Sequence, residues 1–430
     1  MTFNGSLAMA ESYYAATASP SPKHPVLAGN IKADLIVIGG GCTGLSAALF
    51  AARRGLRVVL VEGGKLGWGA SGRNGGQIIP GLRQGPQELA QRYGTDEAKR
   101  LFTLAVSARE LVTGLIEEQG IACDLAMTGH LYAARRADLD GLRREAEFAA
   151  QEMDYPHLSV LDHSDLAEEI ATDHYDGGLL DRRGGHFHPL NYTLGLARAA
   201  EAEGVSIYQE TPVIDLKYNE NIRVRTTLGS VTAPLGVLAC DALLGRLDPG
   251  LAGRIMPIAS HVVTTLPLRP EQIPILRNRA VSDSYYSVNY YRMTADNRLL
   301  FGGGERYFPR KTNHIESIVR APLKKIFPQL AGIAIDHAWG GLVSITTSRL
   351  PDIGRKGALL YAQGYSGQGA ILSTLAGKLM ADAAAGTAGE FDVMSKVRPP
   401  AFPGGTALRT PLHVLGMMWY GLRDRFGGTA

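Results

Sequence analysis

The 430-residue sequence contains only three cysteines, Cys42, Cys123 and Cys240, and they lie far apart in the chain. Without a CxxC pair, they provide neither a disulfide framework nor a structural zinc site. Such sparse cysteine usage is typical of proteins from a reducing compartment. The sequence therefore predicts a protein without a metal site.

The sequence also lacks an excess of charge of either sign. Its 44 basic and 41 acidic residues give a formal net charge of +3, which predicts no binding to nucleic acid or to an anionic membrane. No run reaches the roughly 18 apolar residues of a membrane span. The first 30 residues lack the basic start and the apolar stretch of a signal peptide. We therefore expect a cytoplasmic protein without a transmembrane segment.

What the sequence does contain is a β-α-β pattern near its start. Residues 33–38 (ADLIVI) form a short apolar, β-branched run of the kind found in buried parallel strands. A helix-forming stretch follows at 45–52 and stops at Gly55, a natural C-cap. Residues 57–62 (RVVLVE) then indicate a second strand. This order predicts a parallel sheet with a right-handed crossover.

A glycine-rich turn, GGGCTG at 39–44, lies between this strand and this helix and contains the G-x-G-x-x-G spacing. Gly39 permits the tight turn, Gly41 lets the backbone approach a pyrophosphate, and Gly44 lets helix and strand pack closely. The N–H groups and the positive dipole end of the helix favour phosphate binding. Glu62 ends the second strand, where a carboxylate accepts the hydroxyls of an adenosine ribose. The pattern predicts a dinucleotide site.

Two further features favour FAD over NAD. The loop GWGASGRNGGQ at 67–77 can wrap a pyrophosphate and reach a flavin ring, and Ser71 and Arg73 can meet phosphate charge. No second G-x-G-x-x-G follows a later strand, as a flavin enzyme that also binds NAD(P)H usually needs. The turn GYSGQG at 364–369 precedes a helix whose N-terminus can stabilise a reduced flavin; a plain tight turn is the alternative.

The α/β pattern occurs in three separated blocks, with antiparallel strand patterns between them. We assign the blocks to an FAD-binding domain and the intervening segments to a substrate domain, flanked by an N-terminal arm and a C-terminal tail. The FAD-binding domain comprises 29–88, 160–252 and 335–392, the substrate domain 89–159 and 253–334, the arm 1–28, and the tail with a short helix 393–430.

Together these motifs resemble the D-amino-acid oxidase-like superfamily of FAD proteins and, within it, the γ-glutamylputrescine oxidase family. The resemblance spans nearly the whole chain, and its first and last strings point to the narrower family. The strings are SYYAA (12–16), GASGRNGGQ (69–77), NYYR (289–292), RLLFGG (298–303), RLPDIG (349–354), GYSGQG (364–369) and LGMMWYGLRDR (415–425).

The resemblance implies an α/β protein in which a Rossmann-type FAD-binding domain is interleaved with a mostly antiparallel α+β substrate domain. It implies oxidation of a C–N bond of a small amine or amino acid to an imine, by hydride transfer to flavin N5, with reoxidation by oxygen. Val213 would contact adenine through its backbone. The expected FAD contacts are Gly39, Gly41, Thr43, Gly44, Glu62, Gly63, Ala70, Ser71, Arg73, Asn74, Gly75, Gly76, Gln77, Val213, Gly367, Gln368 and Gly369.

The sequence departs from sarcosine-oxidase relatives at two places. Those relatives attach the flavin to a cysteine shortly before the Pro-Asp of the late loop, whereas 343–347 (VSITT) contains none, so FAD should be non-covalent. They also place a lysine over the flavin to assist oxygen, and the matching strand at 298–301 (RLLF) lacks it. The alternatives are a dehydrogenase that passes electrons to a quinone and a non-catalytic flavin-binding protein.

Candidate substrate contacts lie on 284–292 (SYYSVNYYR). With strand alternation, Tyr286, Tyr290 and Arg292 share one face, where aromatic walls suit an amine and Arg292 could pair with a carboxylate. The alternative is an aromatic sheet face with a surface arginine. His261 is a further candidate, although a lone histidine is more often structural. No obligatory acid or base is expected, because the flavin performs the difficult step.

Three properties stay open at the level of the sequence: the exact substrate, the oligomeric state, and the role of the apolar stretch at 412–422. That stretch could form a helix that docks on the protein or an interfacial anchor.

Overall fold

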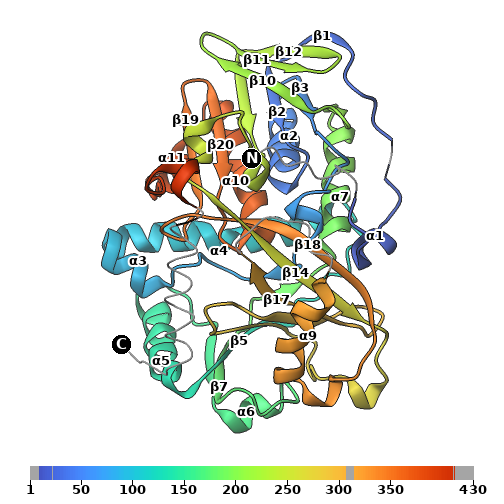
Figure 1. Cartoon of the computed structure of the whole chain (residues 1–430). Coiled ribbons are helices and arrows are strands. Elements are labelled where there is room, and N and C mark those ends of the chain that lie inside the picture. The colour runs from blue at the N-terminus through green and yellow to red at the C-terminus, as the bar shows by residue number, and fades with distance from the viewer. Residues whose placement is uncertain (1–8, 22, 307–313, 410, 412–430) are drawn as a thin grey trace.

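The structure, a computed structural model, describes residues 9–21, 23–306, 314–409 and 411. A six-stranded sheet with its helices fills the upper part of the view in Figure 1, and an eight-stranded sheet fills the lower part. The apolar stretch expected to form a helix at 412–422 lies outside the described residues. In the part of the chain that is described, no helix is both long and apolar enough to cross a bilayer.

The six-stranded sheet contains the β-α-β unit expected from the sequence. All its neighbouring strands are parallel except the pair β19 and β20. Both β2 and β3 are buried along their whole length, as expected of strands covered by helices on both faces. The order is β19 (Asp352–Lys356), β20 (Leu359–Gln363), β13 (Leu235–Leu238), β2 (Leu35–Ile38), β3 (Val58–Val61) and β9 (Ser206–Tyr208).

The order of the strands reverses at β2. The later strands β3 and β9 follow on one side of β2, and β13 and β20 follow on the other. In open sheets of this kind, ligands bind outside the carboxyl ends of the strands at the point of reversal. The fold therefore places a site where β2, β3 and β13 end.

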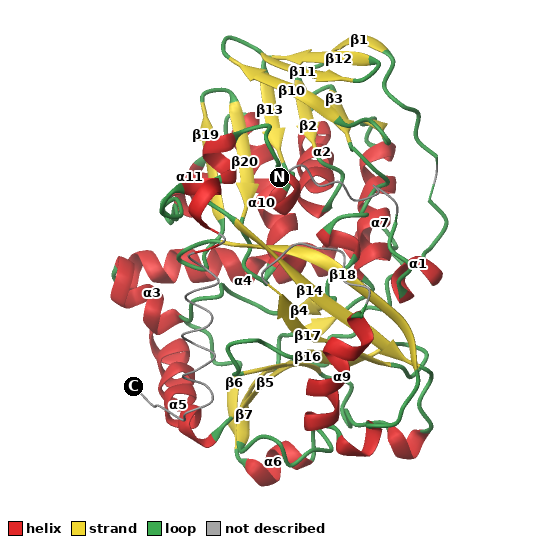
Figure 2. Ribbon diagram, viewed as in Figure 1, coloured by secondary structure: helices red, strands yellow, loops and turns green. Residues whose placement is uncertain are grey.

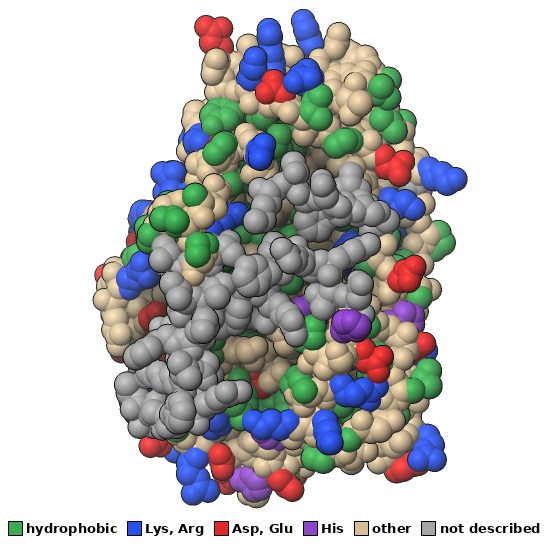
Figure 3. Space-filling model, viewed as in Figure 1, with side chains coloured by type: hydrophobic (Ala, Val, Ile, Leu, Met, Phe, Trp, Pro, Cys, Tyr) green, Lys and Arg blue, Asp and Glu red, His purple; other side chains and the backbone are tan. Residues whose placement is uncertain are grey.

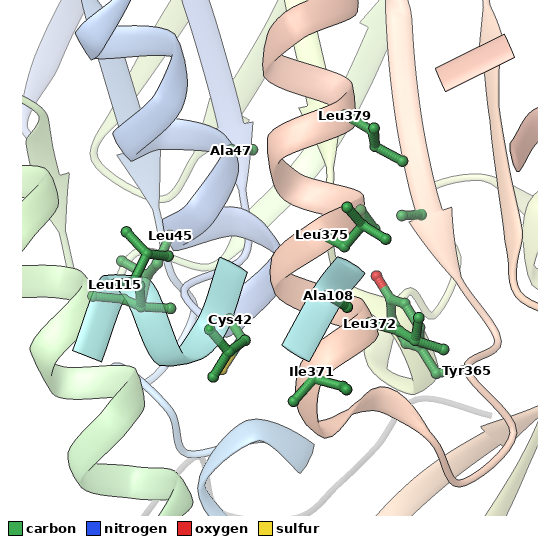
Figure 4. Packing of buried hydrophobic residues seen from close by; sticks show 14 of the residues in the cluster. Cys42, Leu45, Ala47, Ala108, Leu115, Tyr365, Ile371, Leu372, Leu375 and Leu379 are labelled. Atoms are coloured by element: carbon green, nitrogen blue, oxygen red, sulfur yellow. The ribbon is translucent and has the colours of Figure 1, made fainter. Parts of the chain in front are cut away.

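Three helices pack together beside this sheet: α2 (Cys42–Arg53), α7 (Pro189–Ala202) and α10 (Gly369–Ala384). Small residues on α2 let α10 come close, and a Cβ on Gly377 of α10 would overlap Thr43 O. Figure 4 shows the apolar side chains that fill this interface, including Leu45 of α2, Leu115 of α4 (Thr95–Glu118) and Leu375 of α10. Each fully buried leucine contributes about 1.5–3 kcal/mol.

The eight-stranded sheet is mostly antiparallel, as expected of the substrate domain. Only β5 and β15 pair in parallel. The long strands β14 and β18 cross the middle of the molecule in Figure 2. The order is β18 (Ile335–Ile345), β14 (Met256–Thr265), β17 (Leu299–Arg306), β16 (Tyr290–Met293), β15 (Ala280–Asp283), β5 (His130–Ala134), β7 (Gly177–Asp181) and β6 (Leu158–Leu161).

Sheet membership differs from the predicted segment boundaries at two places. Strand β18 falls in 335–392, which we assigned to the FAD-binding domain, yet it pairs with β14 of the eight-stranded sheet. Likewise, β7 falls in 160–252 but pairs with β5. Pairing joins segments far apart in the sequence, and the alternation within one strand does not reveal its partner.

The N-terminal arm is not simply extended. It contains α1 (Tyr13–Ala16), which Ser12 caps by accepting a hydrogen bond from Ala15 N at 3.1 Å. Further on, β1 (Gly29–Lys32) pairs in parallel with β12 (Gly229–Ala233) in a small four-stranded sheet completed by β11 (Ile222–Thr226) and β10 (Val213–Tyr218). The two tyrosines of α1 are buried.

The remaining elements connect the sheets or cover their edges. The short strands β4 (Gln77–Ile78) and β8 (Gly185–His186) pair with each other. The other helices are α3 (Pro86–Tyr93), α5 (Arg136–Glu152), α6 (His163–Ala167), α8 (Pro249–Ala252), α9 (Ile315–Ile326) and α11 (Gly389–Ser395), with the 3-10 turns η1 (Ala70–Gly72), η2 (Asp241–Leu243), η3 (Pro270–Gln272) and η4 (Pro328–Leu330).

Candidate functional site

A cavity of about 1400 Å³ lies where the ends of β2, β3 and β13 meet the eight-stranded sheet. Ile38 and Val61 line it from the first two strands, and Ala239 lines it just beyond β13. Strands β14, β16 and β18 contribute to the opposite wall. Pockets for one small molecule measure roughly 300–1,000 Å³, so this cavity has room for a cofactor and a substrate together.

Most of the residues predicted from the sequence line this cavity. The exceptions are Gly44, Gly76 and Arg292. The lining residues from the prediction are Gly39, Gly41, Thr43, Glu62, Gly63, Ala70, Ser71, Arg73, Asn74, Gly75, Gln77, Val213, Gly367, Gln368, Gly369, Tyr290 and His261.

The glycines of the first turn form a cradle that side chains would fill. Gly39 has φ +115°, and a Cβ there would lie 2.5 Å from Ala239 O. A Cβ on Gly41 would lie 2.7 Å from Ser71 Oγ, in the cavity wall. A Cβ on Gly44 would overlap Gly39 O, so this glycine allows helix and strand to pack closely without facing the cavity. The turn has the shape that a dinucleotide requires.

Glu62 is buried at the end of β3 and lines the cavity. Its Oε2 accepts from Gly40 N at 2.6 Å, and its Oε1 accepts from Gly64 N at 2.8 Å and from Trp68 Nε1 at 2.6 Å. Burial raises the pKa of this carboxyl group, while the hydrogen bonds oppose that rise. A carboxylate has about four acceptor positions, so capacity remains for one ribose hydroxyl.

Ser71 and Arg73, from which we expect phosphate contacts, also make contacts within the protein. Ser71 Oγ accepts from Cys42 N at 3.0 Å, at the N-terminus of α2. The Arg73 guanidinium donates to Trp68 O and, at 3.0 Å, to Gly340 O of β18. Arg73 therefore joins the glycine-rich loop to the eight-stranded sheet. Ser71 and Arg73 both line the cavity.

The late glycine turn lies at the start of α10 and also lines the cavity. Gly367 has φ +94°, a conformation that side-chain-bearing residues rarely adopt. Gln368 Oε1 is buried and has no hydrogen-bond partner among the described residues. A buried acceptor without a partner is costly, so a donor on a ligand would satisfy it. Together with the glycine cradle, this orphan acceptor fits a bound dinucleotide such as FAD.

On the substrate side, Tyr290 of β16 packs over two glycines. A Cβ on Gly75 would lie 2.9 Å from its ring, and a Cβ on Gly302 would overlap the ring. The Tyr290 hydroxyl lies 3.2 Å from Ser260 Oγ of β14. Tyr290 is thus held in the wall between the loop of Gly75 and the eight-stranded sheet.

His261 of β14 lines the cavity and has a defined tautomer. Its Nδ1 lies 2.9 Å from Gly304 O, and a carbonyl oxygen can only accept, so Nδ1 carries the proton. In the neutral ring, Nε2 then carries the lone pair.

Arg292 has a different position from the one expected, and the prediction that it meets a substrate carboxylate is wrong. It is buried and does not line the cavity. Its guanidinium donates to Gly75 O at 2.7 Å, Met293 O at 3.0 Å, Phe187 O at 3.1 Å and Tyr14 Oη at 3.1 Å. Alternation correctly placed it on the face of Tyr290, but protein acceptors occupy the guanidinium.

Tyr286, the third member of the expected face, lies in the loop between β15 and β16 rather than on a strand. It lines the cavity and is 37% exposed, and its hydroxyl accepts from Arg349 at 3.3 Å. Because 284–289 form bends and not a strand, the alternation assumed for this segment does not apply before Tyr290.

Sequence reasoning missed several lining residues. Asp241 follows β13 with φ +46°, and its carboxylate accepts from the Ser344 hydroxyl and from Gly364 N at 2.8 Å. The bonds tie β13 to β18 and to the late glycine turn. Its position after a buried parallel strand was the available signal. Other missed lining residues are Met9, Ala10, Glu11, Trp68, Arg83, Gln84, Glu88, Arg92, Tyr132, Ser282 and Trp339.

Two cysteines, Cys42 and Cys240, also line the cavity. Burial raises the pKa of the Cys42 thiol, and it raises that of Cys240 to about 12. Both are therefore poor nucleophiles at neutral pH. Among the described residues, no group of three or more His, Cys, Asp or Glu side chains could hold a metal ion.

Comparison with known proteins extends this picture. A family model described as DAO, FAD dependent oxidoreductase, matches residues 34–383. The chain is similar to a probable oxidoreductase OrdL of Rhizobium meliloti (strain 1021), with 38% identity covering 99% of this chain and 100% of that protein. It is also similar to gamma-glutamylputrescine oxidoreductase of Escherichia coli (strain K12), with 39% identity covering 97% and 98%.

Among solved structures, the chain is similar to glycine oxidase from Geobacillus kaustophilus. The TM-score is 0.71 at 23% identity, covering 87% of this chain and 97% of that one. L-proline dehydrogenase from P.horikoshii gives a TM-score of 0.69 at 23% identity, covering 83% and 93%. These structural similarities show that the chain has the same fold as those two enzymes.

Proposed function

Because the chain belongs to the DAO family of FAD-dependent oxidoreductases, we propose that it oxidises a carbon–nitrogen bond of a γ-glutamylputrescine-like amine. FAD is the cofactor of this family, and the glycine cradle and the orphan acceptor of Gln368 fit it. The whole-length similarity to gamma-glutamylputrescine oxidoreductase supports the choice of amine.

Charged side chains of both signs in the cavity wall are the observation that carries this choice. Arg83, Glu88 and Arg92 line the cavity from the segment that leads into α3 and from α3 itself. Beside them, Gln84 donates to Glu88 Oε1 at 2.7 Å and keeps its own Oε1 buried without a described partner. A γ-glutamyl group ends in a carboxylate and an ammonium group, and this wall can pair with both.

The bound flavin would accept a hydride from the carbon next to the amine. The protein must then hold that carbon in place and leave the amine uncharged. Tyr290 provides an aromatic wall beside the amine, and His261 lines the same cavity. The proton of the ammonium group passes to water before the carbon–nitrogen bond is oxidised. Loss of hydride and proton leaves an imine, which water hydrolyses to an aldehyde and an amine fragment or ammonia.

A panel of amines tests the substrate. Purified holoenzyme is incubated with γ-glutamylputrescine, putrescine, sarcosine and D- and L-amino acids, and aldehyde and ammonia are measured. We expect the highest kcat/KM for γ-glutamylputrescine. Arg83→Met should raise its KM about tenfold, the value of one lost charge-assisted contact, and should leave putrescine unaffected. Turnover only of sarcosine or free amino acids would overturn the proposed substrate.

The electron acceptor has two candidates, oxygen and a quinone. We propose oxygen, because the relatives of this sequence include the glycine oxidase of Bacillus licheniformis, which is 25% identical over 81% of this chain. The quinone stays the second candidate, because no lysine is found among the described residues that line the cavity. Stoichiometric hydrogen peroxide during turnover supports oxygen. Turnover that requires a soluble quinone analogue and yields no peroxide supports the second candidate.

A further inference from the structure

We propose that the N-terminal segment 12–17 is an anchor that positions the FAD-contacting loop 73–76, acting through Tyr14, Arg292 and Trp339. The inference depends on FAD occupying the cavity, which is part of the proposed function, but not on the identity of the substrate. Three observations support it, one for each of these side chains.

Tyr14 attaches the segment to the protein. Its side chain is fully buried and makes edge-on contacts with His188 at 4.8 Å and Trp339 at 5.4 Å between ring centroids. Thr17 Oγ1 lies 3.0 Å from His188 Nε2, which adds a second attachment. The segment lies beside α7 in Figure 1 and contacts it. Burial of this kind fixes the position of the Tyr14 hydroxyl.

Arg292 connects that hydroxyl to the loop. Its Nη2 donates to Tyr14 Oη at 3.1 Å and to Phe187 O at 3.1 Å, while its Nε donates to Gly75 O at 2.7 Å. A Cβ on Gly76 would lie 3.2 Å from Nη2, so the loop backbone passes directly beside the guanidinium. The planar guanidinium thereby sets the distance between the anchor and Gly75.

Trp339 provides a separate connection to the same loop. Its ring packs against Tyr14, and its Nε1 donates to Arg73 O at 3.0 Å. Trp339 and Arg292 both contact Tyr14, and they hold the carbonyl oxygens of Arg73 and Gly75, respectively. Arg73, Asn74 and Gly75 line the cavity. The segment therefore determines the position of backbone that faces the cofactor.

The residues just before the anchor show the same relationship. Met9, Ala10 and Glu11, which precede the anchor, line the cavity directly. Their placement follows from that of Ser12 and the two tyrosines. The N-terminal segment is therefore part of the cofactor site, and the SYYAA string at 12–16 has a physical role in it.

Removal of single hydroxyl groups tests the proposal. Tyr14→Phe removes the acceptor of Arg292 and keeps the ring. Tyr155→Phe is a matched control, because this buried tyrosine lies outside the anchor and the cavity lining and its hydroxyl donates to Asp181 at 3.0 Å. The dissociation constant for FAD, the visible circular dichroism of bound flavin and the unfolding midpoint of the apoprotein are measured for each protein.

We expect Tyr14→Phe to raise the dissociation constant at least about tenfold, as the loss of a hydrogen bond to a charged group would, and to change the flavin dichroism. Tyr155→Phe should match the wild type in both. Equal constants and spectra for the two variants would overturn the proposal. If Tyr14→Phe does not fold, Trp339→Phe decides, because it removes the N–H that donates to Arg73 O and keeps an aromatic ring against Tyr14, and wild-type values would refute the anchor. Failure of the wild type to bind FAD would refute the proposed function instead.

Discussion

At the scale of single residues, buried carboxyl groups hold the loops around the cavity. Asp283 is fully buried at the end of β15 and accepts from Asn289 N at 2.9 Å, Asn289 Nδ2 at 2.7 Å and Tyr175 Oη at 3.1 Å. These bonds close the loop that carries Tyr285 and Tyr286 into the cavity wall. Burial raises the pKa of Asp283 to about 6.

This raised pKa predicts a pH dependence of stability. Between the ordinary aspartate pKa of 3.8 and about 6, the folded protein binds the proton more strongly than the unfolded chain does. The contribution of Asp283 to the free energy of unfolding is therefore fully present below pH 3.8 and is lost as pH rises through about 6. It amounts to roughly 2–3 kcal/mol. Asp283→Asn should flatten the fall in unfolding free energy between these values, measured by urea denaturation; an unchanged pH profile would contradict the assignment.

Gly41 gives a second prediction at this scale. Its φ of −90° suits any residue, but a Cβ would lie 2.7 Å from Ser71 Oγ in the cavity wall. Gly41→Ala should therefore weaken FAD binding at least tenfold, and because Ser71 must shift it should lower the unfolding free energy by about 1–3 kcal/mol. Gly332→Ala, where a Cβ meets no atom within 4 Å, is the control. Equal FAD affinities for the two variants would count against the cradle.

At the scale of elements, the close contact of α2 and α10 shapes the cofactor turn. Gly377→Ala should destabilise the protein by about 1–3 kcal/mol, because a Cβ would overlap Thr43 O. Gly114→Ala in α4, with open space around its Cβ, should instead be neutral or stabilising by up to about 1 kcal/mol. Urea unfolding compares the two. A Gly377→Ala variant as stable as the wild type would mean that the helices can separate without cost.

Local patterns predicted these elements well, and long-range pairing explains what the sequence could not show. The turn at 39–44 and the strands β2 and β3 follow from adjacent residues, since the glycines, the β-branched run and the helix start are contiguous. The position of β18 depends on its register with β14. The role of Arg292 depends on Tyr14, 278 positions away in the chain. The pairing of β18 with β14 and the bond between Arg292 and Tyr14 each join distant segments, so the residues of one segment alone do not reveal them.

At the scale of the whole molecule, the cavity lies between two sheets, and side chains from both determine what it binds. Charged side chains of both signs are scattered over the face shown in Figure 3, without one dominant sign. In the proposed function, the charges that pair with substrate are instead those of Arg83, Glu88 and Arg92, which line the cavity. We therefore expect substrate selection to depend on local pairing in the cavity.

The state of the cofactor is also a property of the whole site. We expect FAD to be held without a covalent bond, because the thiols of Cys42 and Cys240 in the cavity wall have raised pKa values. Precipitation of the holoenzyme with acid should release all yellow colour into the supernatant. Flavin that stays with the protein pellet and survives proteolysis as a flavinyl peptide would show a covalent link.

Anaerobic reduction of the flavin by γ-glutamylputrescine tests the central claim most directly. The holoenzyme is mixed with the amine without oxygen, and the visible flavin band is followed over time. The proposed function predicts complete bleaching of the flavin band, at a rate that saturates as the amine concentration rises. Glutamate, which lacks the putrescine amine, should cause no bleaching. A flavin band that persists with γ-glutamylputrescine, in a protein that has bound FAD, would contradict the claim.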